Sequence, residues 1–182
     1  MIVILEGPDN VGKTTQIKHI VKYFENHPFH VLKYSKVDVS DQEYYAKMLY
    51  RHMFCFIMDT DENFILDRSH LGEYVYANMY RGYDGDYVFK LEEEFRRRDQ
   101  VKWDLDMFLI TLIDDPQNLI DRDDGQSLSV LPTKKVVEIK RFIEANNRSM
   151  IKHKVLINVN GLTIEAVTAK IIEFFKENNI HV

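Results

Sequence analysis

The N-terminal part of the chain contains a glycine-rich pattern whose residue types are suited to binding phosphate. The segment Gly7-Pro8-Asp9-Asn10-Val11-Gly12-Lys13-Thr14 fits G-x-x-x-x-G-K-[ST]. Its glycines let the backbone turn N–H donors inward around phosphate oxygens, Lys13 can reach the same oxygens, and the Thr14 hydroxyl can ligate Mg²⁺. We therefore predict a phosphate-binding loop, formed by Gly7, Asn10, Val11, Gly12, Lys13, Thr14 and Thr15.

The elements around this loop favour the same interpretation. Residues 1–6 form an apolar run typical of a buried strand, and residues 14–24 have the apolar period of a helix. A helix that begins at the loop directs its N-terminus toward a bound anion. The alternative is a glycine-rich turn with a chance lysine, but such a turn does not require a strand before it and a helix after it.

A second group of polar residues, Asp67-Arg68-Ser69-His70, follows the apolar stretch 64–67. The Asp67 carboxylate could orient water molecules on Mg²⁺ or take a proton, and Arg68 could bind a phosphate through two parallel hydrogen bonds. The alternative is an ion pair at a helix end. Its expected position opposite the phosphate-binding loop favours a functional role, and His70 is expected to orient or pack.

Strand and helix patterns alternate along the chain and predict the framework that must position these groups. The expected strands are 1–6, 30–35, 64–67, 107–114 and 155–159, and the expected helices are 14–24, 41–59, 71–80, 87–100, 134–149 and 163–178. This order predicts an α/β fold with a three-layer arrangement, a parallel sheet flanked by helices, in a single domain over residues 1–182. Ligands of such sheets bind outside the carboxyl ends of the strands.

The amino-acid composition restricts the kinds of molecule that the protein is expected to bind. With 24 Lys and Arg against 29 Asp and Glu, the net charge is −5, which argues against long nucleic acid as a partner. The single Cys55 excludes an intramolecular disulfide, and the sequence has neither an evident signal peptide nor an apolar span long enough for a membrane helix. We expect a cytoplasmic protein that does not bind membranes.

Together, these segments resemble the thymidylate kinase branch of the P-loop kinases. That branch opens with E-G-x-D-x-x-G-K-[ST]-T and has D-R-[YFH] at the end of the third strand; this chain has Glu6 to Thr15 in the first pattern and Asp67-Arg68 in the second. Val75-Tyr76 falls near the family's A-Y. Residues 67–76 and 122–127 are especially similar to the short deoxynucleotide kinases of bacteriophages.

The resemblance implies a P-loop nucleoside monophosphate kinase fold and transfer of the ATP γ-phosphoryl group to a deoxynucleoside monophosphate, with dTMP or dUMP as the expected acceptor. It places Asp9 and Arg68 near the acceptor phosphate, and Thr14 and Asp67 at Mg²⁺. It also implies a homodimer. A monophosphate is already nucleophilic near neutral pH, so positioning and charge neutralisation matter more than a strong base.

The chain departs from the family pattern in two places. The neutral Asn10 stands where some thymidylate kinases have a basic residue, and Ser69 replaces an aromatic residue. Another arginine should therefore neutralise the transferring group, and Arg122 is our candidate. It lies in the polar part of residues 116–131, expected to form a lid that closes over the site. A solvated acidic loop is the alternative.

The expected contacts of the acceptor come from helices that also supply core residues. Arg51, Phe54 and Tyr76 are our candidates for holding the base, although an aromatic stripe at helical spacing is also typical of packing. In the run Arg96-Arg97-Arg98, Arg97 is a candidate for phosphate binding. Cations at the end of a helix also complement its dipole, which is the alternative.

Other functions remain open to different degrees. A regulatory GTPase would require an N-K-x-D segment, and the sequence contains no Asn-Lys pair. A deoxynucleoside kinase would use Asp67 as a base on a hydroxyl group. A polynucleotide 5′-kinase would need a basic groove, which the net charge argues against. A nucleotide-binding module without catalysis is the last alternative.

Overall fold

The computed structural model describes residues 1–34 and 41–180. Its strands are β1 (Ile2–Glu6), β2 (Phe29–Lys33), β3 (Asn63–Asp67), β4 (Met107–Ile113) and β5 (His153–Asn158). Its helices are α1 (Lys13–Tyr23), α2 (Gln42–Met58), α3 (His70–Tyr76), the π-helical η1 (Ala77–Arg81), α4 (Tyr87–Arg98), α5 (Gln100–Asp106), α6 (Pro116–Asp121), α7 (Pro132–Arg148) and α8 (Ile164–Glu177).

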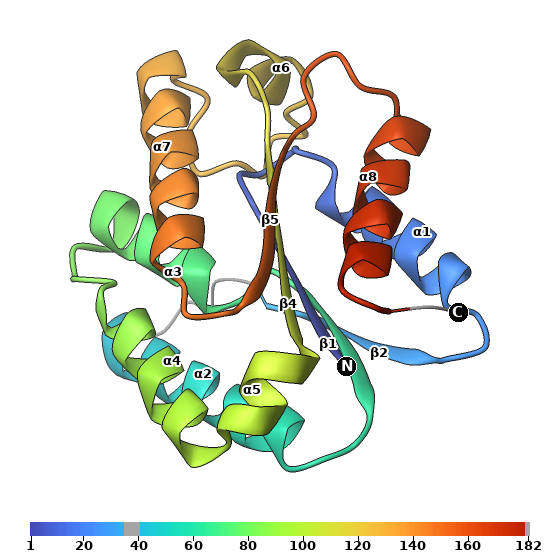
Figure 1. Ribbon diagram of the computed structural model, residues 1–182. Coiled ribbons are helices and arrows are strands. Elements are labelled where there is room, and N and C mark those ends of the chain that lie inside the picture. The colour runs from blue at the N-terminus through green and yellow to red at the C-terminus, as the bar shows by residue number, and fades with distance from the viewer. Residues whose placement is uncertain (35–40, 181–182) are drawn as a thin grey trace.

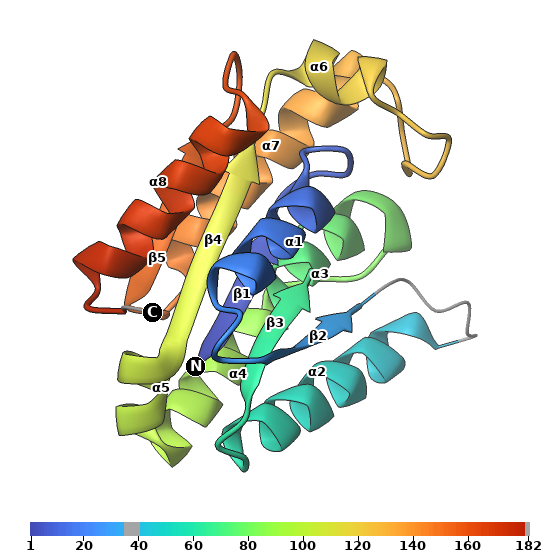
Figure 2. The same ribbon diagram turned by 90° about the vertical axis from the view of Figure 1, so that its right-hand side faces the viewer.

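The five strands form a parallel sheet in the order β2-β3-β1-β4-β5. Helices cover both faces: α2, α3, α4, α5 and α7 lie on one side, and α1 and α8 on the other (Figures 1 and 2). The central strand β1 alternates between these layers, since Ile2 and Ile4 pack into the first and Val3 and Leu5 into the second. The predicted fold class is therefore confirmed.

The register of the sheet brings the polar strand ends together. Lys33 is level with Asp67, and Asp67 with Leu5, while Glu6 is level with Thr111. Strand β1 lies between β3 and β4. The connection that follows β1 runs through α1 on one face of the sheet, and the connection that follows β3 runs through α3, α4 and α5 on the other face. Loops at such a point leave room for a ligand.

Several boundaries differ from the expectations for physical reasons. The helix expected over 87–100 is interrupted at Asp99, whose side chain accepts a hydrogen bond from Lys102 N at 2.9 Å and so begins α5. The helix expected to begin at residue 134 begins at Pro132, a residue favoured in a first helical turn. The last residue of the strand expected over 30–35, Ser35, lies outside the described residues.

The helix expected over 71–80 widens into η1 and ends at Gly82, where φ is +76°. The expected lid segment 116–131 begins with α6, in which Pro116 occupies the first turn and the Asp115 side chain caps the N-terminus. None of the described helices is long and apolar enough to cross a membrane.

Candidate functional site

The loop after β1 has the backbone geometry that its glycines allow. Gly7 has a φ of +138°, and a Cβ atom there would lie 2.2 Å from the carbonyl oxygen of Leu112 on β4. Gly12 has a φ of +97° and precedes the first turn of α1. Any larger side chain at residue 7 would push the loop away from the sheet, so glycine is required for this close approach. Buried Val11 anchors the loop in the core.

Lys13 is folded into the loop. Its Nζ donates hydrogen bonds to the carbonyl oxygens of Gly7 at 2.8 Å and Pro8 at 2.7 Å. Burial, and secondarily the nearby Arg68 charge, lowers the pKa of Lys13 from 10.5 to about 8. The ammonium group is therefore held where phosphate oxygens would bind, and an anion there would favour its charged form.

Thr14 and Asp67 are brought together, as the predicted Mg²⁺ site requires. The Thr14 hydroxyl donates to Oδ2 of Asp67 at 3.0 Å, while Oδ1 of Asp67 is buried and has no hydrogen-bond partner among the described residues. A hydroxyl and a carboxylate with an unused oxygen fit Mg²⁺, which commonly binds one or two protein oxygens together with water and phosphate. The described residues contain no cluster of three or more His, Cys, Asp or Glu side chains that could hold a metal ion alone.

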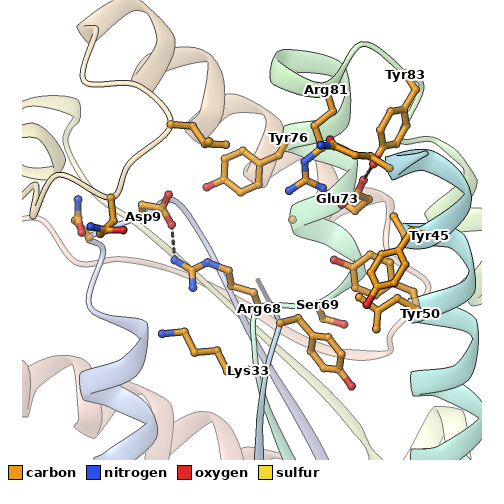
Figure 3. A pocket seen from close by; sticks show the side chains of 18 of the residues that line it. Asp9, Lys33, Tyr45, Tyr50, Arg68, Ser69, Glu73, Tyr76, Arg81 and Tyr83 are labelled. Carbon is orange, nitrogen blue, oxygen red and sulfur yellow. Dashed lines mark hydrogen bonds and ion pairs between the residues drawn. The ribbon is translucent and has the colours of Figure 1, made fainter. Parts of the chain in front are cut away.

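Arg68 occupies an unusual backbone conformation at the end of β3. Its φ is +71°, in the left-handed region that few residues other than glycine adopt, and its backbone N–H donates to Leu5 O at 3.1 Å. The guanidinium forms an ion pair with Asp9 of the phosphate-binding loop (Figure 3). Such strain is commonly retained at functional sites, and here it directs the arginine side chain across the ends of β1 and β3.

Glu6 is a buried carboxylate that the sequence reasoning did not assign a role. Its Oε1 accepts hydrogen bonds from the backbone N–H groups of Ser69 at 2.9 Å and Gly72 at 3.1 Å, while Oε2 is buried without a partner among the described residues. Burial raises its pKa to about 7, with the His70 ring acting in the opposite direction. Glu6 therefore fixes the turn that carries Arg68.

A buried polar network supports the same turn from behind. The Ser69 hydroxyl lies 3.1 Å from His70 Nδ1, and His70 Nε2 lies 2.7 Å from Glu92 Oε1 on α4. Glu92 also accepts hydrogen bonds from Ser149 Oγ at 2.7 Å and from Met150 N at 2.6 Å. These hydrogen bonds hold the buried carboxylate of Glu92 in place. Glu92 in turn fixes the His70 ring, and the ring orients the Ser69 hydroxyl.

The segment predicted to form a lid is attached to the phosphate-binding loop. The Asn10 side-chain amide donates to Asp123 Oδ1 and to Ser127 Oγ, both at 3.0 Å. Arg122 donates to the Asn10 carbonyl oxygen at 3.3 Å and forms an ion pair with buried Asp114 at the end of β4. Asn10 is thus more than a neutral replacement for a cation, since it links the loop to the segment that carries Arg122.

Two cavities meet at the carboxyl ends of the strands. The first has a volume of about 650 Å³ and lies over the phosphate-binding loop, α6 and the turn before α8. The second has a volume of about 520 Å³ and lies between α2, α3 and η1 (Figure 3). Among the described residues, those that line both cavities are Asn10, Lys33, Arg68 and Asp124. A ligand in each cavity would meet its neighbour at this shared wall.

Most predicted site residues line these cavities. Asn10, Val11, Gly12, Lys13, Thr14, Thr15 and Arg122 line the first, and Asp9, Arg68 and Tyr76 line the second. Asp67 is only 2% exposed and lines neither cavity, but it lies beneath the shared wall, where it contacts Thr14 and Lys33.

Three expected acceptor contacts lie elsewhere. Arg51 is on the exposed side of α2 and pairs with Glu94, while Arg97 pairs with Glu93 along α4. Phe54 is fully buried against other aromatic rings of the core. These placements correct the expectation, because the helical stripe that contains Phe54 faces the interior and the arginines find acidic partners on neighbouring turns and helices.

The structure adds residues to which the sequence reasoning gave no role. Lys33, at the end of the edge strand β2, reaches the shared wall with Nζ 3.9 Å from Asp67 Oδ2. Glu73 and Arg81 line the far side of the second cavity, and the turn over residues 161–164 lines the first. The position of Lys33 near the carboxyl end of an expected strand was a signal that could have identified it.

No protein-family model matches this chain, and no curated protein matches its sequence. Solved structures share its fold. Bacillus subtilis YorR, in complex with phosphorylated GDP, has 19% identity and a TM-score of 0.72, covering 100% of this chain and 99% of its own. Candida albicans thymidylate kinase has 17% identity and a TM-score of 0.65, covering 100% and 93%. Deoxyadenosine kinase from M. mycoides with bound dATP has 16% identity and a TM-score of 0.61, covering 97% and 100%.

The architecture is therefore that of the P-loop nucleoside monophosphate kinases: a five-stranded parallel sheet flanked by helices. These likenesses concern the fold, and the chemistry depends on the residues of the site.

Proposed function

We propose that this protein is an ATP- and Mg²⁺-dependent kinase that phosphorylates a deoxynucleoside monophosphate, dTMP or dUMP, to the diphosphate. The observation that carries the proposal is the meeting of two cavities at a wall that contains Arg68 and Lys33. One cavity contains the phosphate-binding loop, and the other is large enough for a second nucleotide. Transfer between two bound nucleotides requires such an in-line meeting point.

The ATP phosphates would lie on the loop, where Lys13 and the backbone N–H groups at the start of α1 face them. The apolar turn before α8, with Leu162 and Ile164, would contact the nucleoside part of ATP. Mg²⁺ bound near Thr14 and Asp67 would neutralise charge on the β- and γ-phosphates.

On the acceptor side, Arg68 would hold the monophosphate. Its partner Asp9 fixes the guanidinium at the shared wall, and Lys33 contributes a second positive charge there. Arg122, on the proposed lid over residues 116–131, would exchange its contact with Asp114 for the transferring phosphoryl group. Asn10 would couple that movement to the loop.

A deoxynucleoside kinase with Asp67 as base is the second candidate. That role requires the carboxylate to reach the acceptor's hydroxyl group. In the structure Oδ2 of Asp67 accepts from Thr14, and Arg68 and Ser69, rather than Asp67, are found among the residues lining the acceptor cavity. This arrangement supports Asp67 as a metal-facing group and favours the monophosphate acceptor.

A direct assay tests the proposal. The protein is incubated with ATP, Mg²⁺ and each deoxynucleoside or deoxynucleoside monophosphate, and the products are separated by ion-exchange chromatography. We expect dTDP or dUDP, and no product with Lys13→Ala. Phosphorylation of nucleosides alone would overturn the choice of acceptor, and inactivity toward both would favour a binding module.

We also propose a cellular role, a location and an oligomeric state for the protein. The resemblance to bacteriophage deoxynucleotide kinases supports a role in deoxynucleotide supply, and we propose a homodimer in the cytoplasm. Sedimentation velocity measures the oligomeric state, and a monomer at micromolar concentration would contradict the dimer.

A further inference from the structure

The acceptor cavity has two chemically different ends. Arg68, Lys33 and Asp9 lie at the end next to the phosphate-binding loop, while Glu73, Arg81 and Tyr83 lie at the opposite end (Figure 3). Glu73 is 2% exposed and accepts hydrogen bonds from Arg81 Nη1 and from the Tyr83 hydroxyl. A buried ion pair at the end of a cavity distant from the phosphate site is positioned to contact the base of a nucleotide.

The local fold builds this ion pair from two adjacent segments. All seven residues of α3 are buried, and Glu73 borders the cavity while remaining only 2% exposed. The wider η1 turns Arg81 back toward α3, and Gly82, with a φ of +76°, ends that turn. Gly85 then passes α3 so closely that a Cβ atom there would lie 2.6 Å from the Cα atom of Tyr74. The π-helical widening is a feature that frequently accompanies functional sites.

The ion pair presents donors to the cavity. Both carboxylate oxygens of Glu73 already accept hydrogen bonds, and the Arg81 side chain, 13% exposed, lines the cavity with N–H groups beyond the one that donates to Glu73. In Figure 3 the guanidinium lies between the ring of Tyr76 and the carboxylate of Glu73. A guanidinium N–H at a cavity wall favours a ligand acceptor over a ligand donor, because two facing donors leave both without a partner.

We propose that Arg81, held in place by Glu73, selects acceptor bases that carry a carbonyl group where cytosine carries an amino group. The inference rests on the proposed function, because it assumes that the monophosphate is held by Arg68 at the other end. The 4-carbonyl oxygen of uracil or thymine would accept from the guanidinium. The amino group of cytosine would face it donor to donor, leaving both without a partner.

Other groups in the cavity discriminate less. Gln42 carries both a donor and an acceptor, so its side chain can rotate to suit either base. Tyr45 and Tyr50 offer ring faces that contact any planar base. At the base end of the cavity, Arg81 is the group among the described lining residues that can only donate, because the hydroxyl groups of Tyr76 and Tyr83 can donate or accept; discrimination between two pyrimidines of the same shape therefore falls to Arg81.

Calorimetric titration with dUMP and dCMP tests the assignment, since the bases of these two ligands differ only in the carbonyl or amino group and the associated ring proton. The main variant is Arg81→Gln with Glu73→Gln, which replaces the ion pair by two neutral amides and leaves no buried charge unpaired. The control is Arg96→Gln with Asp104→Asn, which likewise replaces an arginine–carboxylate ion pair by two neutral amides, at a partly exposed position between α4 and α5 away from the cavity. Thermal unfolding checks that both variants fold.

We expect the wild-type protein and the control to bind dUMP roughly 10- to 100-fold more tightly than dCMP, the range of one good polar base contact. The main variant should bring the two affinities within about threefold, chiefly by weakening dUMP. Equal affinities in the wild type, or an unchanged ratio in the folded main variant, would overturn the assignment. Turnover with ATP is measured separately, so a preserved dUMP preference without phosphoryl transfer would count against the proposed function alone.

Discussion

The buried carboxyl group of Glu6 makes the stability of this protein depend on pH in a direction that can be calculated. Its pKa rises from 4.5 to about 7 because burial penalises the charged form. Between these values the folded protein keeps a proton that the unfolded chain has released. The free energy of unfolding therefore falls as the pH rises from 4.5 to 7.

The magnitude follows from the same two values. Each pH unit contributes about 1.4 kcal/mol, so the interval from 4.5 to about 7 corresponds to about 3 kcal/mol. In Glu6→Gln this contribution disappears, while the amide oxygen can still accept from Ser69 N and Gly72 N. We compare the free energy of unfolding of the variant with that of the wild type at each pH. This difference should favour the variant by about 2 to 3 kcal/mol more at pH 8 than at pH 5.

Urea unfolding followed by circular dichroism at pH 5 and pH 8 measures both proteins. The control is Glu173→Gln on the exposed side of α8, which should shift little between the two pH values. A Glu6→Gln variant with the same relative stability at both values, or one that loses stability at pH 8, would refute the reasoning. The result does not depend on any assumption about catalysis.

Four further outcomes are expected from the site. Lys13→Ala and Arg68→Ala should each lower turnover by about 10² or more, the usual effect of losing transition-state electrostatics, and near-normal steady-state turnover of Arg68→Ala would contradict its phosphate assignment. Arg122→Ala should reduce kcat by a factor of about 10³ if it reaches the transferring group, whereas an effect on stability alone would leave it a structural partner of Asp114. Thr14→Ala should raise the Mg²⁺ concentration needed for half-maximal rate, because Thr14 faces Asp67; an unchanged Mg²⁺ titration would argue against the metal site. Asn10→Ala should increase hydrogen exchange across residues 122–127, since two of its hydrogen bonds hold that segment, and unaltered exchange would show that other contacts do so.

Much of the framework could be predicted from the sequence because its signals are local. The phosphate-binding loop depends on consecutive residues, and its glycines have the backbone angles that the pattern requires. The apolar run over β4 is buried along its whole length, as expected of a central parallel strand. Alternation of strand and helix patterns then restricts the topology to few arrangements.

The composition of the acceptor cavity could not be predicted in this way. Periodicity shows that Phe54 and Tyr50 share a helix, but only packing decides that Phe54 enters the core while Tyr50 lines the cavity. The ion pair of Arg51 on α2 depends on the packing that brings Glu94 of α4 beside it. Lys33 gains its position from the pairing of β2 with β3.

The sequence by itself determined the phosphate-binding loop, the parallel α/β framework and the placement of Asp67 and Arg68 at a strand end, because each follows from contacts between near neighbours along the chain. The tertiary structure alone decided that Glu6 holds the turn of Arg68, that Asn10 is linked to the segment of Arg122, and that Glu73 and Arg81 meet at the end of the acceptor cavity. The contacts of Glu6 and Asn10 join residues far apart in the sequence, and that of Glu73 with Arg81 depends on a widened helical turn. Such contacts form only when elements pack, and residue type and spacing do not specify them.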